Sequence, residues 1–432
     1  MRQPPDDMRV LLVGGGGREH ALAWRLDQSP RVRRIFTTHP ENPGIASLAD
    51  PVGFPFNVKE AYRLRQFCDR EKVNLVVIGP EAPLAAGLAD ALEASGRAVV
   101  GPGAKGAQIE ASKAWSKAFM RAASIPTADG RAFDNAHDAK RWIESREHAP
   151  VVKASGLAAG KGVIVPKTIE EALDAVDRIM SKREFADAGA EIVVEECLDG
   201  REASVFALVD GRTILMLDAC QDHKRLLDYD EGPNTGGMGA YSPARVLDDE
   251  MMTRVEREII LPTVDALRRD GIDYRGVLYV GIMLTHAGPK VLEYNARFGD
   301  PECQTLMPRL IGDLADLLWR TASGSLEDAE IDWDRRSSCC VVIASEGYPE
   351  KPVTGRPISG IEDALAMDDV HVFHAGTAMD KQGALVSVGG RVLSVVALAD
   401  DLAGAREKAN AACACITLEG AQHRSDIGAK AI

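Results

Sequence analysis

The sequence lacks the features that mark several common classes of protein. Its 432 residues contain no apolar run near the roughly 18 residues that cross a bilayer. The first residues, Met1 to Asp7, lack the apolar core of a signal peptide, so we expect a cytoplasmic protein without a membrane partner. Basic residues are outnumbered by acidic ones, 51 to 65, which disfavours a general nucleic-acid binder. Any anionic substrate must therefore be held by local basic groups.

Motifs for a structural metal are also missing. The eight cysteines include no CxxC pair, and the nine histidines include no HExxH or similar zinc spacing. Cys339-Cys340 and Cys413-Ala-Cys415 lie in apolar stretches. We therefore expect buried free thiols rather than disulfides or a zinc site.

The length and the glycine content indicate several α/β and α+β domains. A chain of 432 residues exceeds the size at which a single core stops growing, roughly 250–300 residues. We expect a Rossmann-like amino-terminal domain at residues 1–105 and a central domain at 106–328, with a lid at about 122–192. A small β-rich domain should follow at 329–432, after a linker near 321–336.

The chain opens with an apolar strand that runs into glycines. Met8–Val13 precedes Gly14–Gly17 and then a stretch with helical spacing, which is typical of a doubly wound domain whose loop amides hold an anion. The third glycine of the dinucleotide pattern is absent, which disfavours a nicotinamide or flavin and favours a smaller phosphate-bearing ligand. A tight turn without a ligand is the alternative. Glu81 follows the buried strand Val73–Ile78, where it either faces the same ligand or caps a helix.

A second glycine-rich segment joins two apolar strands at residues 150–165. Lys153 ends the first strand, and Lys161 lies in the loop Gly156–Gly162. The glycine spacing is one residue too short for a P-loop, and a strand follows where a helix should. We interpret the segment as a lid over phosphates, with Lys153 fixed beneath it.

Two further polar segments complete the candidate nucleotide site. The strand at Glu191–Cys197 enters an acidic turn, which suits the hydrogen-bonding of an adenine and a ribose, or is simply a solvated hairpin. The stretch Gln221–Arg225 precedes a long glycine-rich loop, Gly232–Pro243, that contains no aliphatic core. With His223 and the neighbouring basic residues, this loop is predicted to form an anion pocket.

The richest cluster of polar residues follows the apolar strand near residue 291. Glu293 and Asn295 are two apart, so in a strand they share one face and can hold one hard cation such as Mg²⁺. Arg297 lies on the same side if the strand continues. Alone, this pair is a weak signal, because a strand end with polar tips is the more common explanation.

Taken in order, these segments resemble the family of phosphoribosylamine-glycine ligases, also called glycinamide ribonucleotide synthetases, of the ATP-grasp superfamily. The resemblance runs from about Arg9 to Ile432 and continues in the last domain with Gly347-Tyr-Pro349, Val372–Thr377 and Gly389–Leu393. The segments that carry it are Gly16–Ala21, Gly79–Leu84, Lys153–Val163, Gln221–Arg225, Gly232–Tyr241 and Glu293–Glu302.

The resemblance implies a two-lobed ATP-grasp core behind the Rossmann-like domain, and a reaction of de novo purine biosynthesis. ATP would phosphorylate the carboxylate of glycine, and the amine of 5-phosphoribosylamine would then attack the glycyl phosphate. Glycinamide ribonucleotide, ADP and phosphate would be the products. Mg²⁺, or alternatively Mn²⁺, is implied as the metal, and a monomer or a weak dimer is expected.

The resemblance also assigns site residues. Lys153 and Arg297 would be the catalytic residues. Glu293 and Asn295 would hold the metal. ATP would contact Lys113, Lys153, Lys161, Glu195, Glu196, Cys197, Leu198, Glu202, Arg225 and Asn234. The phosphoribosyl group would meet Gly15, Gly16, Arg18 and Glu81, and glycine would meet the loop Thr235, Gly236, Gly237 and Met238. Arg297 and Asp300 would also contact substrate.

Two other functions are alternatives to this ligase activity. One is another ATP-grasp ligase or carboxylase acting on a related carboxylate, although no biotinyl-lysine segment is present. The other is a non-catalytic nucleotide-binding regulator, against which Lys153, Glu293, Asn295 and Arg297 all count. Asp222, His223 and Asp300 are candidates for a general base, each with an ion-pairing or capping role as the alternative.

Overall fold

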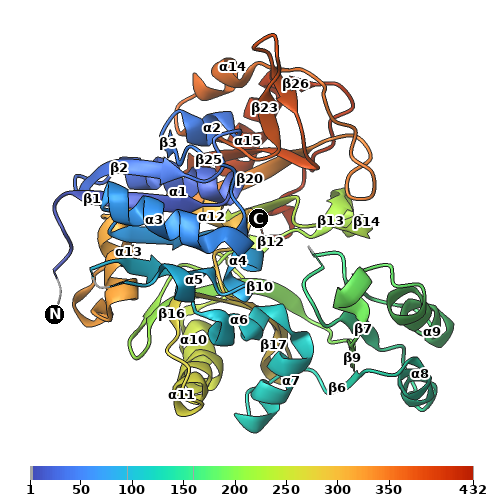
Figure 1. The fold of residues 1–432 in the computed structure, drawn as a ribbon. Coiled ribbons are helices and arrows are strands. Elements are labelled where there is room, and N and C mark those ends of the chain that lie inside the picture. Colours follow the sequence, from blue (N-terminus) through green and yellow to red (C-terminus); the bar gives the residue numbers. More distant parts are fainter. Residues whose placement is uncertain (1–2, 95, 159, 432) are drawn as a thin grey trace.

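The computed structural model describes residues 3–94, 96–158 and 160–431. Figure 1 shows the amino-terminal domain beside a central region, with a smaller antiparallel unit at one side and the carboxy-terminal strands above. This arrangement agrees with the predicted multidomain α/β and α+β fold. The limits at 105/106 and 328/329 stay a prediction.

The amino-terminal domain is a parallel sheet with helices around it. The sheet has the order β3-β2-β1-β4-β5. Its strands are β1 (Met8–Val13), β2 (Val32–Thr37), β3 (Asp50–Pro51), β4 (Leu75–Ile78) and β5 (Ala98–Val100). The helices are α1 (Gly17–Asp27), α2 (Pro43–Ala46), α3 (Ala61–Glu71), α4 (Glu81–Ala85) and α5 (Leu88–Leu92). The central strands β1 and β4 are buried on both faces, which is why their sequences are continuous apolar runs.

A long antiparallel sheet forms the centre of the molecule, with the order β11-β10-β16-β17. Its strands are β10 (Arg201–Asp210), β11 (Ile214–Met216), β16 (Arg275–Thr285) and β17 (Gly288–Asn295). The helices of this region are α6 (Ala104–Ala111), α7 (Lys113–Ala122), α10 (Asp249–Val255), α11 (Leu261–Arg269), α12 (Glu302–Leu306) and α13 (Leu314–Ser323). The predicted helix from Asp249 to Arg269 is confirmed, with a π-helical segment joining α10 to α11.

The predicted lid is a separate antiparallel sheet with the order β6-β9-β7-β8. Its strands are β6 (Gly130–Phe133), β7 (Val151–Ala154), β8 (Val163–Ile164) and β9 (Ile192–Glu195), and its helices are α8 (Ala136–Glu144) and α9 (Ile169–Val176). The helices bury their apolar faces against β7 and β9, which gives this unit its own core. The expected glycine-rich hairpin is confirmed, because β7 and β8 pair with Lys153 opposite Val163.

The carboxy-terminal strands form one sheet with strands of the central region. The order is β12-β15-β20-β25-β22, and Tyr241 of β15 lies opposite Cys339 of β20. The strands are β12 (Gln221–Asp222), β15 (Gly239–Ser242), β20 (Ser337–Ala344), β22 (Val370–His374) and β25 (Arg391–Ala399). The helix α15 (Leu402–Cys415) packs on them. The last unit therefore shares its sheet with the segment that carries the candidate anion pocket.

Short elements complete the fold. They are β13 (Arg225–Leu227), β14 (Glu231–Asn234), β18 (Leu310–Ile311), β19 (Asp332–Trp333), β21 (Ile358–Ser359), α14 (Ile361–Leu365), β23 (Thr377–Met379), β24 (Leu385–Ser387) and β26 (Thr417–Leu418). The expectation of a continuous loop at Gly232–Pro243 is wrong, because β14 pairs with β13 and β15 joins the shared sheet.

The expected linker near 321–336 is also wrong. The helix α13 continues to Ser323, and β19 pairs with β18. The buried Arg309 holds this segment in place by donating to the carbonyl oxygens of Asp334 at 2.8 Å and Arg336 at 2.7 Å. The hydrogen bonds from this guanidinium to backbone carbonyl oxygens fix the segment, although its sequence shows only a change in composition.

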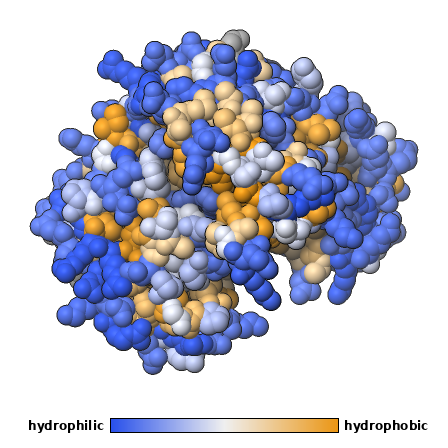
Figure 2. All heavy atoms as spheres, turned by 90° about the horizontal axis from the view of Figure 1, so that it is seen from above, coloured by the Kyte–Doolittle hydropathy of each residue, from blue (hydrophilic) through white to orange (hydrophobic). Residues whose placement is uncertain are grey.

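Hydrophilic residues make up most of the face seen from above in Figure 2. Within the described ranges, no helix combines the length and the apolar character needed to span a bilayer. Six of the cysteines are buried free thiols as predicted, but Cys197 is exposed and Cys415 is half-buried. Cys197 differs because it lies where β9 has already ended in a polar turn.

Candidate active site

One cavity of about 1160 Å³ opens where the lid, the central sheet, the amino-terminal loop and the carboxy-terminal unit meet. Most of the predicted site residues line it. They are Gly15, Gly16, Arg18, Glu81, Lys113, Lys153, Glu195, Glu196, Cys197, Leu198, Glu202, Arg225, Asn234, Thr235, Gly236, Glu293, Asn295, Arg297 and Asp300. Lys161, Gly237 and Met238 do not line it.

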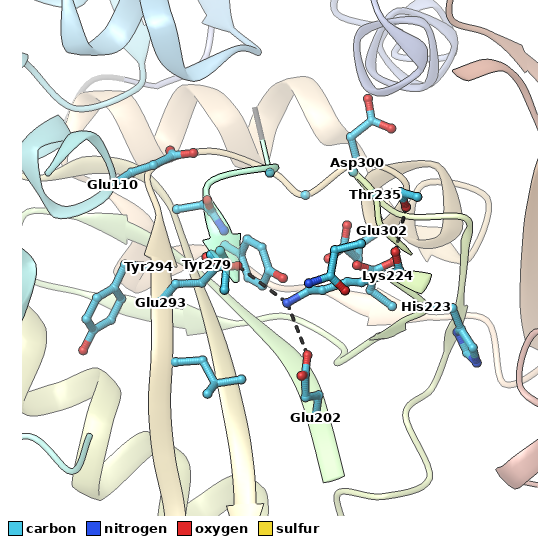
Figure 3. A pocket seen from close by; sticks show the side chains of 18 of the residues that line it. Glu110, Glu202, His223, Lys224, Thr235, Tyr279, Glu293, Tyr294, Asp300 and Glu302 are labelled. Carbon is cyan, nitrogen blue, oxygen red and sulfur yellow. Dashed lines mark hydrogen bonds and ion pairs between the residues drawn. The ribbon is translucent and has the colours of Figure 1, made fainter. Parts of the chain in front are cut away.

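Glu293 lies at the centre of a group of cations. A bulge at Leu292 places Gly281 of β16 opposite Glu293, and a Cβ at Gly281 would meet Glu293 Cγ at 3.4 Å. Lys224 lies between two carboxylates, with its Nζ 3.6 Å from Glu293 and 3.2 Å from Glu202, as Figure 3 shows. Burial alone would raise the pKa of Glu293, but Lys224, Lys113, Lys153 and Arg297 together lower it to about 2. Glu293 is therefore an anion at every physiological pH.

Asn295 and Glu293 give the donor set expected for a hard divalent cation. Both lie on β17, two residues apart, and both line the cavity, so the shared face predicted from their spacing agrees with the structure. One carboxylate and one amide oxygen suit Mg²⁺, which keeps water and phosphate oxygens as its other ligands. The Asn295 Oδ1 accepts a hydrogen bond of 3.3 Å from Arg297.

Arg297 follows the end of β17, and two carboxylates hold it in the cavity wall. It forms ion pairs with Glu110 at 2.8 Å and Glu81 at 3.4 Å. Although burial opposes it, the pKa of Arg297 is held above its usual value by Glu110 and Glu81. Burial raises the pKa of Glu110, yet this carboxylate also accepts a hydrogen bond of 2.7 Å from the Ala296 amide. The guanidinium is therefore charged and fixed in orientation.

The lid contributes Lys153 to the same place. Its Nζ donates to the Leu292 carbonyl oxygen at 3.1 Å, next to Glu293, and forms an ion pair with Glu195. Lys117 of α7 binds the other oxygen of Glu195 at 2.6 Å. Although burial opposes it, Lys153 and Lys117 hold the pKa of Glu195 below its usual value. Lys153 therefore belongs to strand β7 of the lid, and its side chain lies beside the candidate metal ligand Glu293.

The amino-terminal glycine loop faces the other end of the cavity. A Cβ at Gly15 would lie 2.6 Å from His39 Cβ, so only glycine allows this approach. The Arg18 guanidinium is buried and is used internally, through an ion pair of 2.6 Å with Glu19 and a hydrogen bond of 3.1 Å to the Phe298 carbonyl oxygen. The Arg18 amide donates to Asp300 at 3.4 Å, which joins this loop to the segment after β17.

The predicted glycine loop at Thr235–Met238 only partly reaches the cavity. Met238 is fully buried and packs with Leu226 and Ala344, because its amide pairs with the His223 carbonyl oxygen and turns the side chain into a small core. The lid residue Lys161 donates to the Pro349 carbonyl oxygen at 2.6 Å instead of facing the cavity. The loop surface open to a ligand is thus Thr235 and Gly236.

The candidate general bases differ in protonation. Burial, with Glu302 next, raises the pKa of Asp222 well above its usual value, and its Oδ1 has no hydrogen-bond partner among the described residues. Burial, with Arg424 next, lowers the pKa of His223 to about 4, and its Nε2 accepts from the Gly428 amide at 3.2 Å. Although burial opposes it, Arg391 and Arg18 hold the pKa of Asp300 below its usual value. Of the three candidate bases, Asp300 is therefore the one whose side chain is a charged carboxylate.

Four important residues were not among the predicted site residues. Glu110 and Lys117 lie on α6 and α7, and their only signal in the sequence is a charge within an apolar helical stretch. Glu302, which accepts from Ser204 at 3.2 Å, is the last residue of the segment Glu293–Glu302 but was given no role. Arg391 comes from β25, and nothing local in the sequence connects it to this cavity.

The fold and the site define a class. The cavity is bounded by an antiparallel core sheet and an antiparallel lid, and it lies behind a parallel α/β domain. Lysines from both sides are directed at a carboxylate. This is the arrangement of ATP-grasp enzymes.

Comparison with known families identifies which ATP-grasp family the chain belongs to. The phosphoribosylglycinamide synthetase N domain matches residues 8–110, its ATP-grasp (A) domain matches 111–303, and its C domain matches 338–430. The chain belongs to the phosphoribosylglycinamide synthetase family.

Individual relatives agree with this assignment. A phosphoribosylamine–glycine ligase from Rhodopirellula baltica is 48% identical over 430 residues, which are 98% of each chain. The trifunctional purine biosynthetic protein adenosine-3 of Gallus gallus is 47% identical over 98% of this chain, which spans 42% of that protein. The crystal structure of a phosphoribosylamine–glycine ligase from Thermotoga maritima has a TM-score of 0.81 and 29% identity, over 97% of this chain and all of that one.

More distant structures share the fold alone. The biotin carboxylase domain of the Hydrogenobacter thermophilus 2-oxoglutarate carboxylase has a TM-score of 0.72 at 17% identity and covers 98% of this chain and 92% of that chain.

The family match and the curated relatives confirm three predictions: the family, the fold class and the activity of an ATP-dependent ligase. The chain is an ATP-dependent ligase of purine biosynthesis.

Proposed function

We propose that this chain joins glycine to 5-phosphoribosylamine in two steps. A carboxylate oxygen of glycine attacks the γ-phosphorus of ATP, so that ADP leaves and glycyl phosphate forms. The amine nitrogen then attacks the glycyl carbon, and phosphate leaves with the former carboxylate oxygen. The amine loses one proton, and glycinamide ribonucleotide is the product.

The observation that carries this proposal is the convergence of cations on Glu293. Lys153 comes from the lid, Lys113 from the start of α7, Lys224 from the segment after β12 and Arg297 from the end of β17. Bringing a carboxylate to a triphosphate concentrates negative charge, and fixed cations in a partly dry cavity favour that arrangement. Partner carboxylates hold three of these cations in place: Glu195 holds Lys153, Glu202 holds Lys224 and Glu110 holds Arg297.

Within this scheme the nucleotide lies between the lid and the central sheet. The end of β9 and the polar turn after it, from Glu195 to Leu198, line the adenine, and Glu202 accepts from the ribose. Lys113, Lys153, Arg225 and Asn234 hold the phosphates. Lys161 reaches the phosphates only after leaving the Pro349 carbonyl oxygen. Glu293 and Asn295 hold Mg²⁺, for which Mn²⁺ is the alternative, and such a cation neutralises phosphate charge when it is bound.

The two other substrates occupy the ends of the cavity. Glycine lies against Thr235 and Gly236, beside Asp222, whose pKa is raised by burial, and Glu302. The phosphoribosyl group lies against Gly15, Gly16, Arg18 and Glu81. Asp300 is the base best placed for the amine proton, because it is charged and its Oδ2 lies 3.4 Å from the Arg18 amide.

Several further properties belong to the same proposal. The protein works in the cytoplasm as a monomer or a weak dimer, with small molecules as its only substrates. Its domains divide at 105/106 and 328/329.

The proposal is tested by measuring ADP release with each substrate omitted in turn. ADP should form rapidly only when ATP, glycine and 5-phosphoribosylamine are all present. Release of ADP that responds to bicarbonate or formate instead of glycine would favour another ATP-grasp reaction. Nucleotide binding without any substrate-dependent turnover would favour a regulator.

A further inference from the structure

The backbone of Gly236 is held on both sides by side chains of the carboxy-terminal unit. The Gly236 amide donates to the Tyr348 hydroxyl oxygen at 3.0 Å. The Arg391 Nη1 donates to the Gly236 carbonyl oxygen at 2.7 Å. Both partners are more than 100 residues away in the sequence. The loop residue that faces the cavity therefore has its peptide groups fixed from outside its own segment.

Tyr348 is itself rigidly placed. Its ring packs on the small core that contains Leu226, Met238 and Ala344. Gly390 allows this position, since a Cβ there would lie 2.3 Å from the Tyr348 ring. The Ser345 amide donates to the Gly390 carbonyl oxygen at 2.8 Å, which fixes the turn that carries Tyr348. The hydroxyl can thus set the position of the Gly236 amide rather than follow it.

Arg391 joins the loop to the opposite wall of the cavity. Besides Gly236, it donates to the Asp300 carbonyl oxygen at 2.6 Å and lies 3.4 Å from the Asp300 carboxylate. A planar guanidinium can hold several acceptors in fixed directions, which a lysine cannot do. Arg391 therefore sets the distance between the loop at Gly236 and Asp300.

The lid tip rests on the same loop. A Cβ at Gly160 would lie 3.6 Å from Gly236 Cα, and Lys161 donates to the carbonyl oxygen of Pro349, next to Tyr348. The loop is enclosed between the lid tip and the Tyr348 turn, so its position depends on contacts that the loop cannot supply itself.

We propose that Tyr348 and Arg391 are positioning residues for the amino-acid substrate, acting through the backbone of Gly236. This inference rests on the proposed function, in which this loop binds glycine. Tyr348 acts on the glycine site alone. Arg391 acts on the glycine site and, through Asp300, on the site of the amine.

The test compares steady-state constants for all three substrates in Tyr348→Phe and Arg391→Lys. A neutral hydrogen bond corresponds to a change of about 2- to 12-fold in an equilibrium constant, so the KM for glycine should rise by about that factor in Tyr348→Phe. The KM for ATP and for phosphoribosylamine should not change. In Arg391→Lys the KM for both glycine and phosphoribosylamine should rise, and Arg391→Met should be worse than Arg391→Lys. Tyr62→Phe, which removes an exposed hydroxyl on α3, is the matched control.

A general loss of structure would lower the melting temperature and raise all constants together, whereas the positioning role changes only the selected ones. An unchanged KM for glycine in both Tyr348→Phe and Arg391→Lys overturns the inference, as does an equal rise in the KM for ATP. Arg391→Lys probes the same residue, Gly236, through its carbonyl group, so this variant still decides the question if Tyr348→Phe is unstable. If the wild-type protein does not require glycine at all, the proposed function itself has failed.

Discussion

Replacing Glu293 by glutamine should change both the stability and the metal dependence of this protein. The substitution keeps the shape of the side chain and removes its charge. The lowering of the pKa of Glu293 from 4.5 to about 2 corresponds to a net stabilisation of its charged form by about 3 kcal/mol, after the cost of burial has been offset by the cations. Because the folded pKa lies below the unfolded one, this stabilisation is present above pH 4.5 and is lost as the pH falls towards 2.

The free energy of unfolding of Glu293→Gln at pH 7 should therefore be lower by up to about 3 kcal/mol without nucleotide. Denaturant unfolding followed by fluorescence measures this difference, with the exposed Glu250→Gln on α10 as the matched control. Nucleotide affinity, titrated with and without Mg²⁺, should lose its dependence on Mg²⁺ in the variant. Glycine-dependent ADP release should be abolished.

The reasoning would be refuted by a Glu293→Gln protein that matches the wild type in stability at pH 7 and still binds ATP more tightly with Mg²⁺. Such a result would mean that the cations near Glu293 do not respond to its charge. It would also remove the metal role assigned to β17.

Three further substitutions test other parts of the site. Arg297→Met leaves the buried Glu110 carboxylate without its partner, so the free energy of unfolding should fall by about 3–5 kcal/mol in a denaturant titration. A smaller loss in the double variant with Glu110→Gln would support the pairing. Gly237→Ala should raise the KM for glycine more than the KM for ATP. Gly237 has a φ of +112°, and a Cβ there would lie 2.7 Å from Pro301 Cδ, so the loop must shift. Wild-type kinetics in this variant would contradict the packing. Burial lowers the pKa of His20 from 6.5 to about 3. Below pH 6.5 the unfolded chain therefore binds a proton that the folded chain does not. The free energy of unfolding should fall there by up to about 1.4 kcal/mol per pH unit. In His20→Gln the melting temperature should decline less steeply between pH 6.5 and 4, and an unaltered slope would show that His20 does not contribute.

Local spacing was enough to predict part of the site. The alternation in a strand placed Glu293 and Asn295 on one face, and glycines between two apolar strands predicted the hairpin that carries Lys153. These features depend on residues that are close in sequence. The resemblance to a known family added their roles, which spacing alone does not give.

Other parts depend on pairing between distant segments and could not be predicted. Nothing near Tyr241 indicates that its strand lies beside Cys339, and the expected linker after α13 is fixed by Arg309 from an earlier turn. The contacts of Gly236 with Tyr348 and Arg391 join segments more than 100 residues apart. A sequence pattern states which residues are polar, but the partner of each is decided by the packing of whole sheets.

The central claim is that cations from separate elements bring a triphosphate to the carboxylate of glycine. Its most direct test traces a carboxylate oxygen of glycine into the released phosphate. Glycine labelled with ¹⁸O in its carboxylate is turned over with ATP and phosphoribosylamine, and the released phosphate is analysed by mass spectrometry. The account predicts that each phosphate carries one oxygen from glycine. Unlabelled phosphate formed in step with the amide product would contradict it.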